Sequence, residues 1–479
     1  MLLETVIGLE IHAELKTNTK IFCSCSTEFG AKPNENTCPV CLAIPGTLPV
    51  LNEEVVNLAI KAGRATGCKI NNYNKMDRKN YFYPDLTKNY QTSQYDIPMC
   101  VEGKVDFKYE GKDVSVGITR IHIEEDAGKL IHLEGEPVSL IDYNRAGVPL
   151  IEIVTEPDLR SPGEAAEFMR ELKVILEYSD ISDCRMDQGS LRCDANISLR
   201  PYGQEKYGTK VEIKNINSFR EVQKALEEEE KRQRELYEKG EESQIKQETR
   251  RWDASKGKTI VMRTKEEAHD YRYFPEPDLT PILIDEEKIA ELEKSLPEMP
   301  MKKRERFVAE YKLSEKDSSI IVSSKILSKY YEDIVNLGGN PKTVSNYILG
   351  ELLRLVNINN LEEKDLKVSP KNFVELLKII ESGKISNTAG KEVFKEMFAT
   401  NKSPEIIIEE KGLSQISSTD EIDKLIDKVL NDNPQSIEDF KAGKTKVVGF
   451  LMGQVMKLSK GKANPSVAKD MIEEKLKKI

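Results

Sequence analysis

The sequence is poor in several residue types, and each shortage excludes a class of protein. Only one Trp and four His occur among 479 residues, and no Cys and His are arranged as a nucleophile with its base. No apolar run approaches the roughly 18 residues that cross a membrane as a helix. The first ten residues carry acids and no basic segment ahead of an apolar one, so no secretory signal is expected in them. These absences predict a cytoplasmic protein.

Two catalytic signatures are missing as well. A P-loop has a Gly five residues before its final Gly-Lys-Ser/Thr, but Trp252 stands at that place before Gly257, and Glu438 stands there before Gly443. No Gly- and Ser-rich amidase signature occurs either. The chain is therefore not expected to release ammonia from glutamine by itself.

Charge is distributed unevenly along the chain. The net charge of −10 argues against a protein that coats nucleic acid over its whole surface. Residues 441–479, however, contain ten Lys and three acids, a local balance of +7. A basic patch is therefore expected in this segment.

The order of patterns predicts an α+β protein of several domains. Short alternating runs between Gly, Pro and Asn turns make residues 1–293 β-rich, and Pro297 and Pro300 mark a boundary after them. The pattern is helical from there on, with a second break near residues 401–404, which predicts domains of residues 1–293, 294–405 and 406–479. The very polar helix 219–242 is expected to be solvated and to bridge between elements. The expected strands are Thr5–Leu15, Ser115–Glu125, Val148–Thr155, Leu191–Arg200 and Thr209–Ile216, and the expected helices are Glu53–Thr66, Ser161–Tyr178 and Phe219–Glu242.

Four of the eight cysteines lie close together in the sequence. Cys23 and Cys25 are followed after twelve residues by Cys38 and Cys41, and the loop between the pairs contains Gly, Pro and Asn residues that let it fold back. Two close thiol pairs at such spacing are typical of a structural zinc site, because four thiolates complete a tetrahedron and leave no open position. Four unligated thiols are the alternative.

The predicted strands carry polar side chains on one face. Alternate residues of a strand share a face, so Glu10, His12 and Glu14 oppose the apolar positions of the first strand. Asp194 in the fourth strand and Glu212 and Lys214 in the fifth oppose apolar residues in the same way. A merely solvated face is the alternative, but His mixed with acids is unusual on such a face.

More acids stand at the end of the second strand, where Glu124, Glu125 and Asp126 are adjacent. Hard oxygen ligands at this density suit Mg²⁺, which in turn holds nucleotide phosphates. Alternation places Glu124 with His122 and Glu125 with apolar neighbours. The pattern alone does not decide which carboxylates bind metal among Glu124, Glu125, Glu152, Asp194 and Glu212.

A further segment, 77–85, mixes cations with aromatic residues ahead of a turn. Its side chains suit contacts with a phosphate, a base or the terminal adenosine of a tRNA. Ordinary core aromatics beside a loop are the alternative.

Several of these segments together resemble the B subunit of the aspartyl/glutamyl-tRNA(Asn/Gln) amidotransferases. The resemblance extends in order over the whole chain, and within residues 77–94 Thr87 stands where the family has Pro. The matching segments are residues 8–15, the Cys23/Cys25/Cys38/Cys41 cluster, 77–94, 123–129, 144–150, 212–215, 271–279 and 449–457.

The resemblance implies a fold and an activity. The fold is a cradle domain with an antiparallel, glutamine-synthetase-like sheet, followed by two helical domains. The activity is ATP-dependent phosphorylation of the side-chain carboxylate of misacylated Glu-tRNA(Gln), Asp-tRNA(Asn) or both, then amidation with ammonia. An amidase-type glutaminase, the A subunit, would supply the ammonia through an internal channel. A small third protein, the C subunit, would complete a heterotrimer.

The resemblance also assigns roles to residues. It implies that Mg²⁺ is bound by Glu10, His12, Glu124 and Glu125, while the thiol spacing already predicts zinc at Cys23, Cys25, Cys38 and Cys41. Lys79 and Lys214 are expected to hold phosphate oxygens of ATP, with Asp194 and Glu212 as further cofactor-binding residues. Lys457, Lys460 and Lys462 in the basic tail are expected to bind tRNA.

Two rival functions remain at this point. One is a non-catalytic tRNA-binding scaffold, and the other is an archaeal-type paralogue specific for Glu-tRNA(Gln), whose inserted domain is not evident in the sequence. The sequence does not distinguish Glu-tRNA from Asp-tRNA as the substrate.

Overall fold

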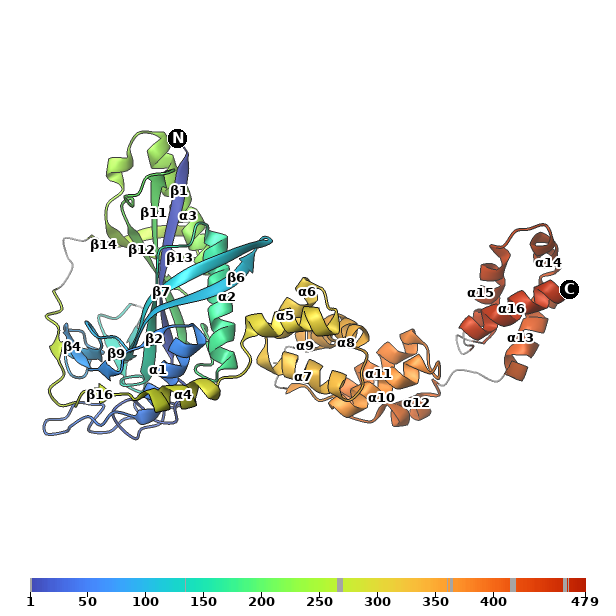
Figure 1. Cartoon of the computed structure of the whole chain (residues 1–479), viewed down its shortest axis with the longest axis horizontal. Helices are drawn as coiled ribbons and strands as arrows, with labels where there is room; N and C mark the ends of the chain where they lie inside the picture. The colour runs from blue at the N-terminus through green and yellow to red at the C-terminus, as the bar shows by residue number, and fades with distance from the viewer. Residues whose placement is uncertain are drawn as a thin grey trace. The chain divides into compact units, whose positions relative to one another are not determined.

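The computed structural model describes residues 2–133, 135–264, 270–359, 361, 365–413, 419–459, 463 and 465–479. The chain divides into two compact units, Met1–Lys303 and Arg304–Ile479. The first is mixed α/β and contains a large sheet, and the described part of the second is helical (Figure 1). The further predicted division of the second unit near residue 405 stays a prediction.

The large sheet has nine strands in the order β14-β13-β12-β11-β1-β10-β7-β6-β2. Neighbouring strands are antiparallel, as predicted, except that β12 and β13 run parallel. All five predicted strands are present, and β11 and β12 pair as the two arms of a hairpin. The bounds are β1 Leu3–Glu14, β2 Lys69–Ile70, β6 Cys100–Tyr109, β7 Lys112–Glu125, β10 Pro149–Thr155, β11 Leu191–Pro201, β12 Val211–Ile216, β13 Glu248–Asp253 and β14 Lys258–Thr264.

Helices α1 (Glu53–Ala65), α2 (Pro162–Tyr178) and α3 (Phe219–Glu238) pack on one face of this sheet. Each begins at a polar N-cap whose side chain accepts a backbone N–H bond from the first turn, namely Asn52, Ser161 and Ser218. Their apolar sides and the inward side chains of the strands form one hydrophobic core. The opposite face of the sheet is thereby left for polar side chains.

Helix α3 differs from the expectation of a solvated bridge. Its residues Val222, Ala225 and Leu226 are fully buried against the sheet. Its polar residues Glu229 and Gln233 are also buried. The Glu229 carboxylate accepts hydrogen bonds from Arg232 and Thr259, which replace the water it loses. The polar sequence of α3 thus hides a packed face in which charges are paired.

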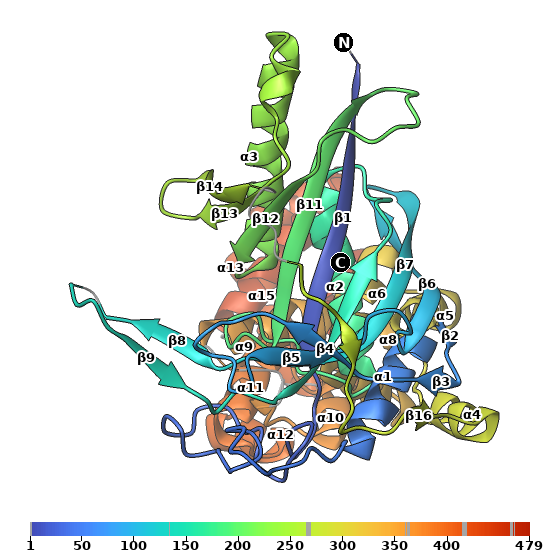
Figure 2. The ribbon, with the colours of Figure 1, turned by 90° about the vertical axis from the view of Figure 1, so that its left-hand side faces the viewer.

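Three small sheets lie outside the large one. Two of them pair strands near residues 275 and 283 with strands within residues 73–80, about 200 positions earlier in the chain. Figure 2 shows β4 and β5 in front of the lower part of the large sheet, with α2 behind it. The sheets are β8 Lys129–His132 with β9 Ser139–Asp142, β15 Phe274–Pro275 with β4 Asp77–Asn80 and β5 Tyr90–Ser93, and β16 Ile282–Leu283 with β3 Tyr73–Asn74.

The remaining helices follow the sheet region along the chain. Near the end, α13, α15 and α16 share a hydrophobic cluster built around Ile426, Leu451 and Ile472. In the described part of the chain, no helix combines the length and apolarity needed to span a membrane. The bounds are α4 Glu286–Lys294, α5 Pro300–Tyr311, α6 Glu315–Val322, α7 Lys325–Asn336, α8 Pro341–Tyr347, α9 Leu353–Ile358, α10 Pro370–Glu381, α11 Asn387–Thr400, α12 Pro404–Lys411, α13 Thr419–Asp432, α14 Pro434–Lys441, α15 Val447–Leu458 and α16 Pro465–Lys478, with a short π-helix at Ile348–Leu352.

Candidate functional site

The polar face of the sheet is built by the alternation that the sequence predicts. In β1 the side chains of Leu9 and Ile11 are buried in the core, while Glu10 and His12 lie half-buried on the other face. Strand pairing then places polar residues of neighbouring strands side by side, with Glu10 opposite Asp194 and His12 opposite Glu152. Residues far apart in the sequence therefore meet on one surface.

The first acidic group consists of Glu10, Asp194 and Glu212, from β1, β11 and β12. One ligand oxygen of each lies within 4.8 Å of the others. The ammonium of Lys214 pairs with Asp194 and lies 3.1 Å from a carboxylate oxygen of Glu212. Burial works against the charge of Lys214, but the two carboxylates outweigh it and raise the pKa of Lys214. This group therefore contains its own permanent cation.

The second acidic group consists of His12, Glu124 and Glu152, from β1, β7 and β10. His12 Nε2 lies 3.4 Å from Glu152 and 3.8 Å from Glu124. His122 joins the group, with its Nε2 3.2 Å from Glu124 and 3.3 Å from Glu152. Because both imidazoles sit between the two carboxylates, the acids are held in place from two sides.

Two side chains of β5 anchor the second acidic group. The Ser93 hydroxyl donates to Glu124 Oε1 at 2.7 Å, and the Gln91 amide donates to Glu124 Oε2 at 3.2 Å. Glu124 is only 2% exposed, so these bonds replace the water that its carboxylate loses on burial. The geometry of Glu124 is thereby fixed by neighbours on a separate small sheet.

Electrostatics differ between the two groups. Burial raises the pKa of Glu10 in the first group, and the charge of Glu152 adds to the effect. In the second group burial acts to lower the pKa of His12, but the hydrogen bond and charge of Glu152 outweigh it and raise that pKa. Burial would raise the pKa of Glu152, yet its bonds to His12 and His122 lower it. The charge of the second group is thus balanced by imidazoles.

Lys79 in β4 supplies a cation near the second acidic group. Its Nζ lies 5.9 Å and 5.1 Å from the ring centroids of Tyr81 and Tyr271. Burial acts to lower the pKa of Lys79, but the charges of Glu124 and of nearby tyrosines raise it overall. Among carboxylates of the described residues, none forms a direct ion pair with this ammonium. Lys79 is therefore a cation without a direct carboxylate partner among the described residues.

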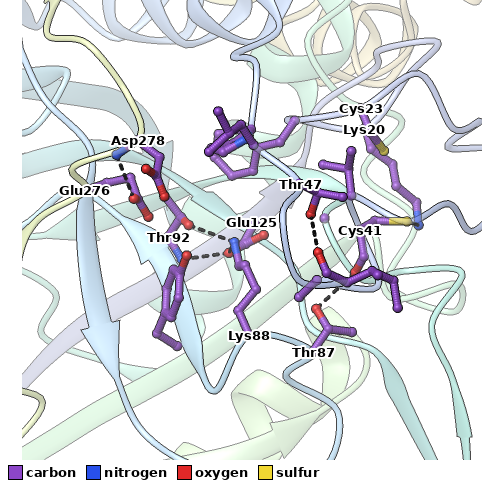
Figure 3. Close-up of a pocket in the computed structure, with 18 of the residues that line it drawn as sticks. Lys20, Cys23, Cys41, Thr47, Thr87, Lys88, Thr92, Glu125, Glu276 and Asp278 are labelled. Carbon is purple, nitrogen blue, oxygen red and sulfur yellow. Dashed lines mark hydrogen bonds and ion pairs between the residues drawn. The ribbon is translucent and has the colours of Figure 1, made fainter.

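Glu125, adjacent to Glu124, is directed elsewhere. It belongs to neither acidic group, since it pairs with Lys88 and accepts a 2.8 Å bond from the backbone N–H of Thr92. Figure 3 shows this pair in a pocket of about 390 Å³ that also contains Cys41 and Thr87 in its wall. Of the predicted metal ligands, Glu10 belongs to the first acidic group and His12 and Glu124 to the second, while the predicted metal-binding role of Glu125 stays a prediction.

The four predicted zinc ligands come together. The sulfur atoms of Cys23, Cys25, Cys38 and Cys41 all lie within 4.8 Å of one another. The Cys38 backbone N–H and the Lys20 ammonium approach Cys41 Sγ at 3.1 and 3.6 Å. Hydrogen bonding from Cys23 is the main cause that lowers the pKa of Cys41, to about 4. Thr87, which stands where the family has Pro, donates its hydroxyl hydrogen to the Cys41 carbonyl at 3.0 Å and so supports this loop.

The donor sets agree with the metals that the sequence suggested. Three carboxylates in the first acidic group offer the oxygen ligands that Mg²⁺ prefers, and the second group adds one imidazole nitrogen to two carboxylates, a set for divalent cations more generally. Four sulfur atoms within 4.8 Å of one another fit tetrahedral Zn²⁺.

Some residues of the site were missed by sequence reasoning. Lys88, Gln91 and Ser93 stand in or beside the short strand β5, whose four residues show no clear period. Alternation in β7 placed His122 on the same face as Glu124, but His122 was not predicted as a site residue. Of the predicted tRNA-binding residues, Lys457 is exposed near the end of α15, whereas Lys460 and Lys462 lie outside the described residues.

Comparison with known proteins gives the same relationship over the whole chain. Residues 5–290 match the family model described as GatB/GatE catalytic domain, and residues 329–476 match the one described as GatB domain. A Clostridium beijerinckii protein named as the B subunit of aspartyl/glutamyl-tRNA(Asn/Gln) amidotransferase is 67% identical over 99% of both chains. Proteins of the same name from Thermoanaerobacter pseudethanolicus and Carboxydothermus hydrogenoformans are 57% and 52% identical, again over 99% of both chains. The chain therefore belongs to the family of aspartyl/glutamyl-tRNA(Asn/Gln) amidotransferase B subunits.

Proposed function

We propose that this protein phosphorylates the side-chain carboxylate of Glu-tRNA(Gln), Asp-tRNA(Asn) or both with ATP, and that ammonia then displaces the phosphate. The observation that carries the proposal is the pair of acidic groups on one sheet face, with Lys79 close by. The names of the relatives support an amidotransferase that acts on these tRNAs. Both products would serve protein biosynthesis.

The chemistry explains why such a site is needed. A carboxylate and the γ-phosphate of ATP are both anions, so they approach only where their repulsion is cancelled. Magnesium ions bound to the two acidic groups would supply that charge when present. The first group would use Glu10, Asp194 and Glu212, and the second would use His12, Glu124 and Glu152.

Lysines complete the binding of phosphate in this proposal. Lys79 has no carboxylate partner among the described side chains, so its ammonium can hold a phosphate oxygen as the phosphoryl group moves. Lys214 already pairs with Asp194 and Glu212, and it would orient these acids while contributing charge. Glu125 would act differently from the other acids, because it pairs with Lys88 at the wall of the pocket.

The ammonia is proposed to come from a partner. The sequence has no amidase signature, which agrees with a heterotrimer in which an amidase-type partner hydrolyses glutamine and a small third protein completes the assembly. The basic tail around Lys457 is proposed to bind tRNA phosphates. The ammonium of Lys457 is exposed and has no acid within ion-pair distance among the described residues.

A structural zinc ion is proposed for the four thiols. Its role would be to hold together the two ends of the loop of residues 23–41, where Cys23, Val40 and Cys41 line the pocket in Figure 3. Elemental analysis of the purified protein should give one zinc per chain. A chain without zinc whose Cys41→Ser variant unfolds at the wild-type temperature contradicts this assignment.

The experiment that tests the function supplies free ammonia in place of glutamine to the assembled enzyme. Ammonia bypasses the partner's chemistry, so a remaining defect belongs to this chain. Glu10→Ala and His12→Ala should each slow amidation of the misacylated tRNA by about 10²- to 10³-fold, whereas Asp113→Ala, an exposed acid on β7, should not. Wild-type rates in both site variants would favour a non-catalytic scaffold and refute the proposal.

A further inference from the structure

A charged side chain beside the four thiols is completely buried. Lys20 is 0% exposed, and no other lysine among the described residues is buried. Removing an ammonium from water costs much free energy unless a negative charge and hydrogen-bond acceptors replace the water. The surroundings of Lys20 should therefore contain a negative charge.

Carboxylates do not supply that charge. Among the described residues, no Asp or Glu lies within ion-pair distance of the Lys20 ammonium. Its two polar neighbours are Cys41 Sγ at 3.6 Å and the carbonyl oxygen of Tyr143 at 3.2 Å. Figure 3 shows the Lys20 nitrogen beside the sulfur of Cys41. Because a carbonyl is neutral, the sulfur is the group that can bring negative charge to Lys20.

The backbone around Lys20 holds its side chain against the thiols. The N–H of Lys20 donates to the carbonyl of Cys25 at 3.0 Å, so the lysine lies against the first thiol pair. The next N–H, that of Ile21, donates to the Gly147 carbonyl at 2.9 Å. This second bond fastens the same stretch to the segment that contains Tyr143. The ammonium is thus fixed at the sulfur rather than free to turn toward solvent.

Cys41 receives donors from two sides. The backbone N–H of Cys38 approaches its sulfur at 3.1 Å, and the Lys20 ammonium approaches it at 3.6 Å. Gly147 lies next to this contact, since a Cβ there would be 3.8 Å from Lys20 Cδ and 3.9 Å from Cys41 Cβ. Charges interact strongly where water is excluded in this way. The site is therefore built to hold a negatively charged sulfur.

Zinc binding would make the whole cluster negative. Thiols bind Zn²⁺ as thiolates, so each of the four would lose its proton. Four thiolates around one Zn²⁺ leave two negative charges in excess, and all four cysteines are only partly exposed. A buried cation at one of the sulfurs offsets part of this excess. The zinc-bound cluster and the lysine thus each provide the charge that the other needs.

An anion site in the neighbouring pocket is the alternative role for Lys20. The residue lines the pocket of about 390 Å³ in Figure 3, as Lys88 does. However, the exposed fraction of Lys20 is zero, so a solute in the pocket does not reach its side chain. The ammonium is also occupied by Cys41 and Tyr143. These contacts favour a role toward the thiols.

We propose that Lys20 is the counter-charge of the zinc-tetrathiolate cluster and that its ammonium raises the affinity of the four thiols for Zn²⁺. The inference rests on the structural zinc ion of the proposed function. Lys20 is a positioning residue and not a ligand, because an ammonium has no lone pair to donate to the metal. Residues that bond to metal ligands in this manner typically change metal affinity by about 10- to 100-fold.

The test measures the zinc affinity of the purified full-length chain under reducing conditions, by competition with a chromogenic chelator. Lys20→Met removes the charge but keeps a long aliphatic side chain, so the zinc dissociation constant should rise by about 10- to 100-fold. Lys32→Met is the matched control, because Lys32 lies in the loop between the two thiol pairs and is exposed. The control should keep the wild-type dissociation constant.

A second variant protects the test against misfolding. Lys20→Gln removes the charge but keeps an N–H donor for the Tyr143 carbonyl, which Lys20→Met leaves without its lysine partner. Its zinc dissociation constant should rise in the same range as that of Lys20→Met. Urea unfolding of the zinc-free chains measures lost packing separately. A purely structural lysine would change this stability and leave the zinc affinity as it is.

Each contrary outcome identifies what has failed. A wild-type chain that binds no zinc overturns the zinc assignment and this inference with it, while the proposed phosphorylation still stands on the Glu10 and His12 variants. A zinc-binding wild type with the same dissociation constant in both Lys20 variants overturns only the role of Lys20. Wild-type affinity in Lys20→Gln beside a loss in Lys20→Met would assign the effect to the hydrogen bond and refute the counter-charge. An equal loss in Lys32→Met would refute it as well.

Discussion

The two acidic groups lie next to each other on one sheet face, yet they balance their charge differently. Glu10, Asp194 and Glu212 surround the ammonium of Lys214, whereas the second group sets His12 and His122 between its two carboxylates. A lysine keeps its charge at all ordinary pH values, and an imidazole does not. The comparison shows that one strand, β1, can contribute to two acidic groups of different charge balance from residues only two positions apart.

The largest expected effect is at Glu124 in the second group, and its chain neighbour Glu125 provides the comparison. Glu124→Gln should slow ammonia-dependent amidation by about 10²- to 10³-fold, because it removes an anionic ligand of the proposed metal ion that would neutralise the developing phosphate charge. Glu125→Gln should slow this step by less than about tenfold, since Glu125 pairs with Lys88 and lies outside the group. Steady-state rates with saturating ATP and ammonia distinguish the two. Equal losses would place Glu125 in the site after all.

An ion pair outside the acidic groups serves as a reference. Arg78 forms two hydrogen bonds to Glu276, a carboxylate that is 4% exposed. Arg78→Met should lower the free energy of unfolding by about 3 kcal/mol, because it leaves a buried charge without its partner. Urea unfolding with and without Mg²⁺ measures this loss, and Mg²⁺ should not restore it.

The same pair also predicts a pH dependence. Burial acts to raise the pKa of Glu276, but the bonds to Arg78 lower it below the ordinary value of a carboxyl group. The unfolded chain therefore binds this proton at higher pH than the folded chain does, so the stabilisation is present near neutral pH and is lost as pH falls through the lowered pKa. In Arg78→Met this part of the acid sensitivity should disappear. An unchanged dependence between pH 7 and about pH 3 would contradict the pairing.

Lys214 gives a smaller effect of a different kind. Lys214→Met leaves the first acidic group without its internal cation, and the partly exposed acids should then cost about 1–2 kcal/mol of unfolding free energy without metal. Millimolar Mg²⁺ should restore most of that loss, unlike the loss in Arg78→Met. The exposed pair of Lys69 and Glu102 is the control, and Lys69→Met should change stability very little. If Mg²⁺ restores nothing, the first group is not a cation site.

The smallest expected effect lies in the second unit, where Lys457 is proposed to attract tRNA phosphates directly. Lys457→Glu should raise the KM for tRNA only about two- to threefold and reduce the salt dependence of binding by about one phosphate contact. The exposed Lys428 on α13 supplies a charge-matched control in Lys428→Glu. Filter binding over a salt series separates them. Identical salt slopes in both variants and the wild type remove Lys457 from the tRNA contact.

Parts of this site follow from the sequence and parts do not. Alternation predicted the faces of β1 and β11, because a two-residue period shows which side chains leave the core. It also placed Glu124 with His122, as the structure does. The support of Glu124 by Gln91 and Ser93 could not be predicted, since those residues stand in a four-residue strand.

Contacts between distant segments were also beyond the sequence pattern. Tyr271 reaches Lys79 because the chain near β15 returns to β4, and the bond from Asn80 to the Tyr271 carbonyl joins residues 191 positions apart. The alternation of polar and apolar residues within a segment gives no information on which distant segment it will pair with. The helix α3 was misjudged for a related reason, because its buried Glu229 looks like a solvated residue until Arg232 and Thr259 are placed beside it.

The central place of β1 has a consequence for synthesis on the ribosome. Leu9 bonds to Thr155, 146 residues later, and Glu10 accepts from Asn196, 186 residues later. At about 5–20 residues per second, β1 waits roughly 10–40 s before both flanking strands have been made. Until then its apolar side stays without a partner, and contacts of such long sequence separation form slowly. The strand that contributes Glu10 and His12 thus depends on protection from aggregation while the chain is being made.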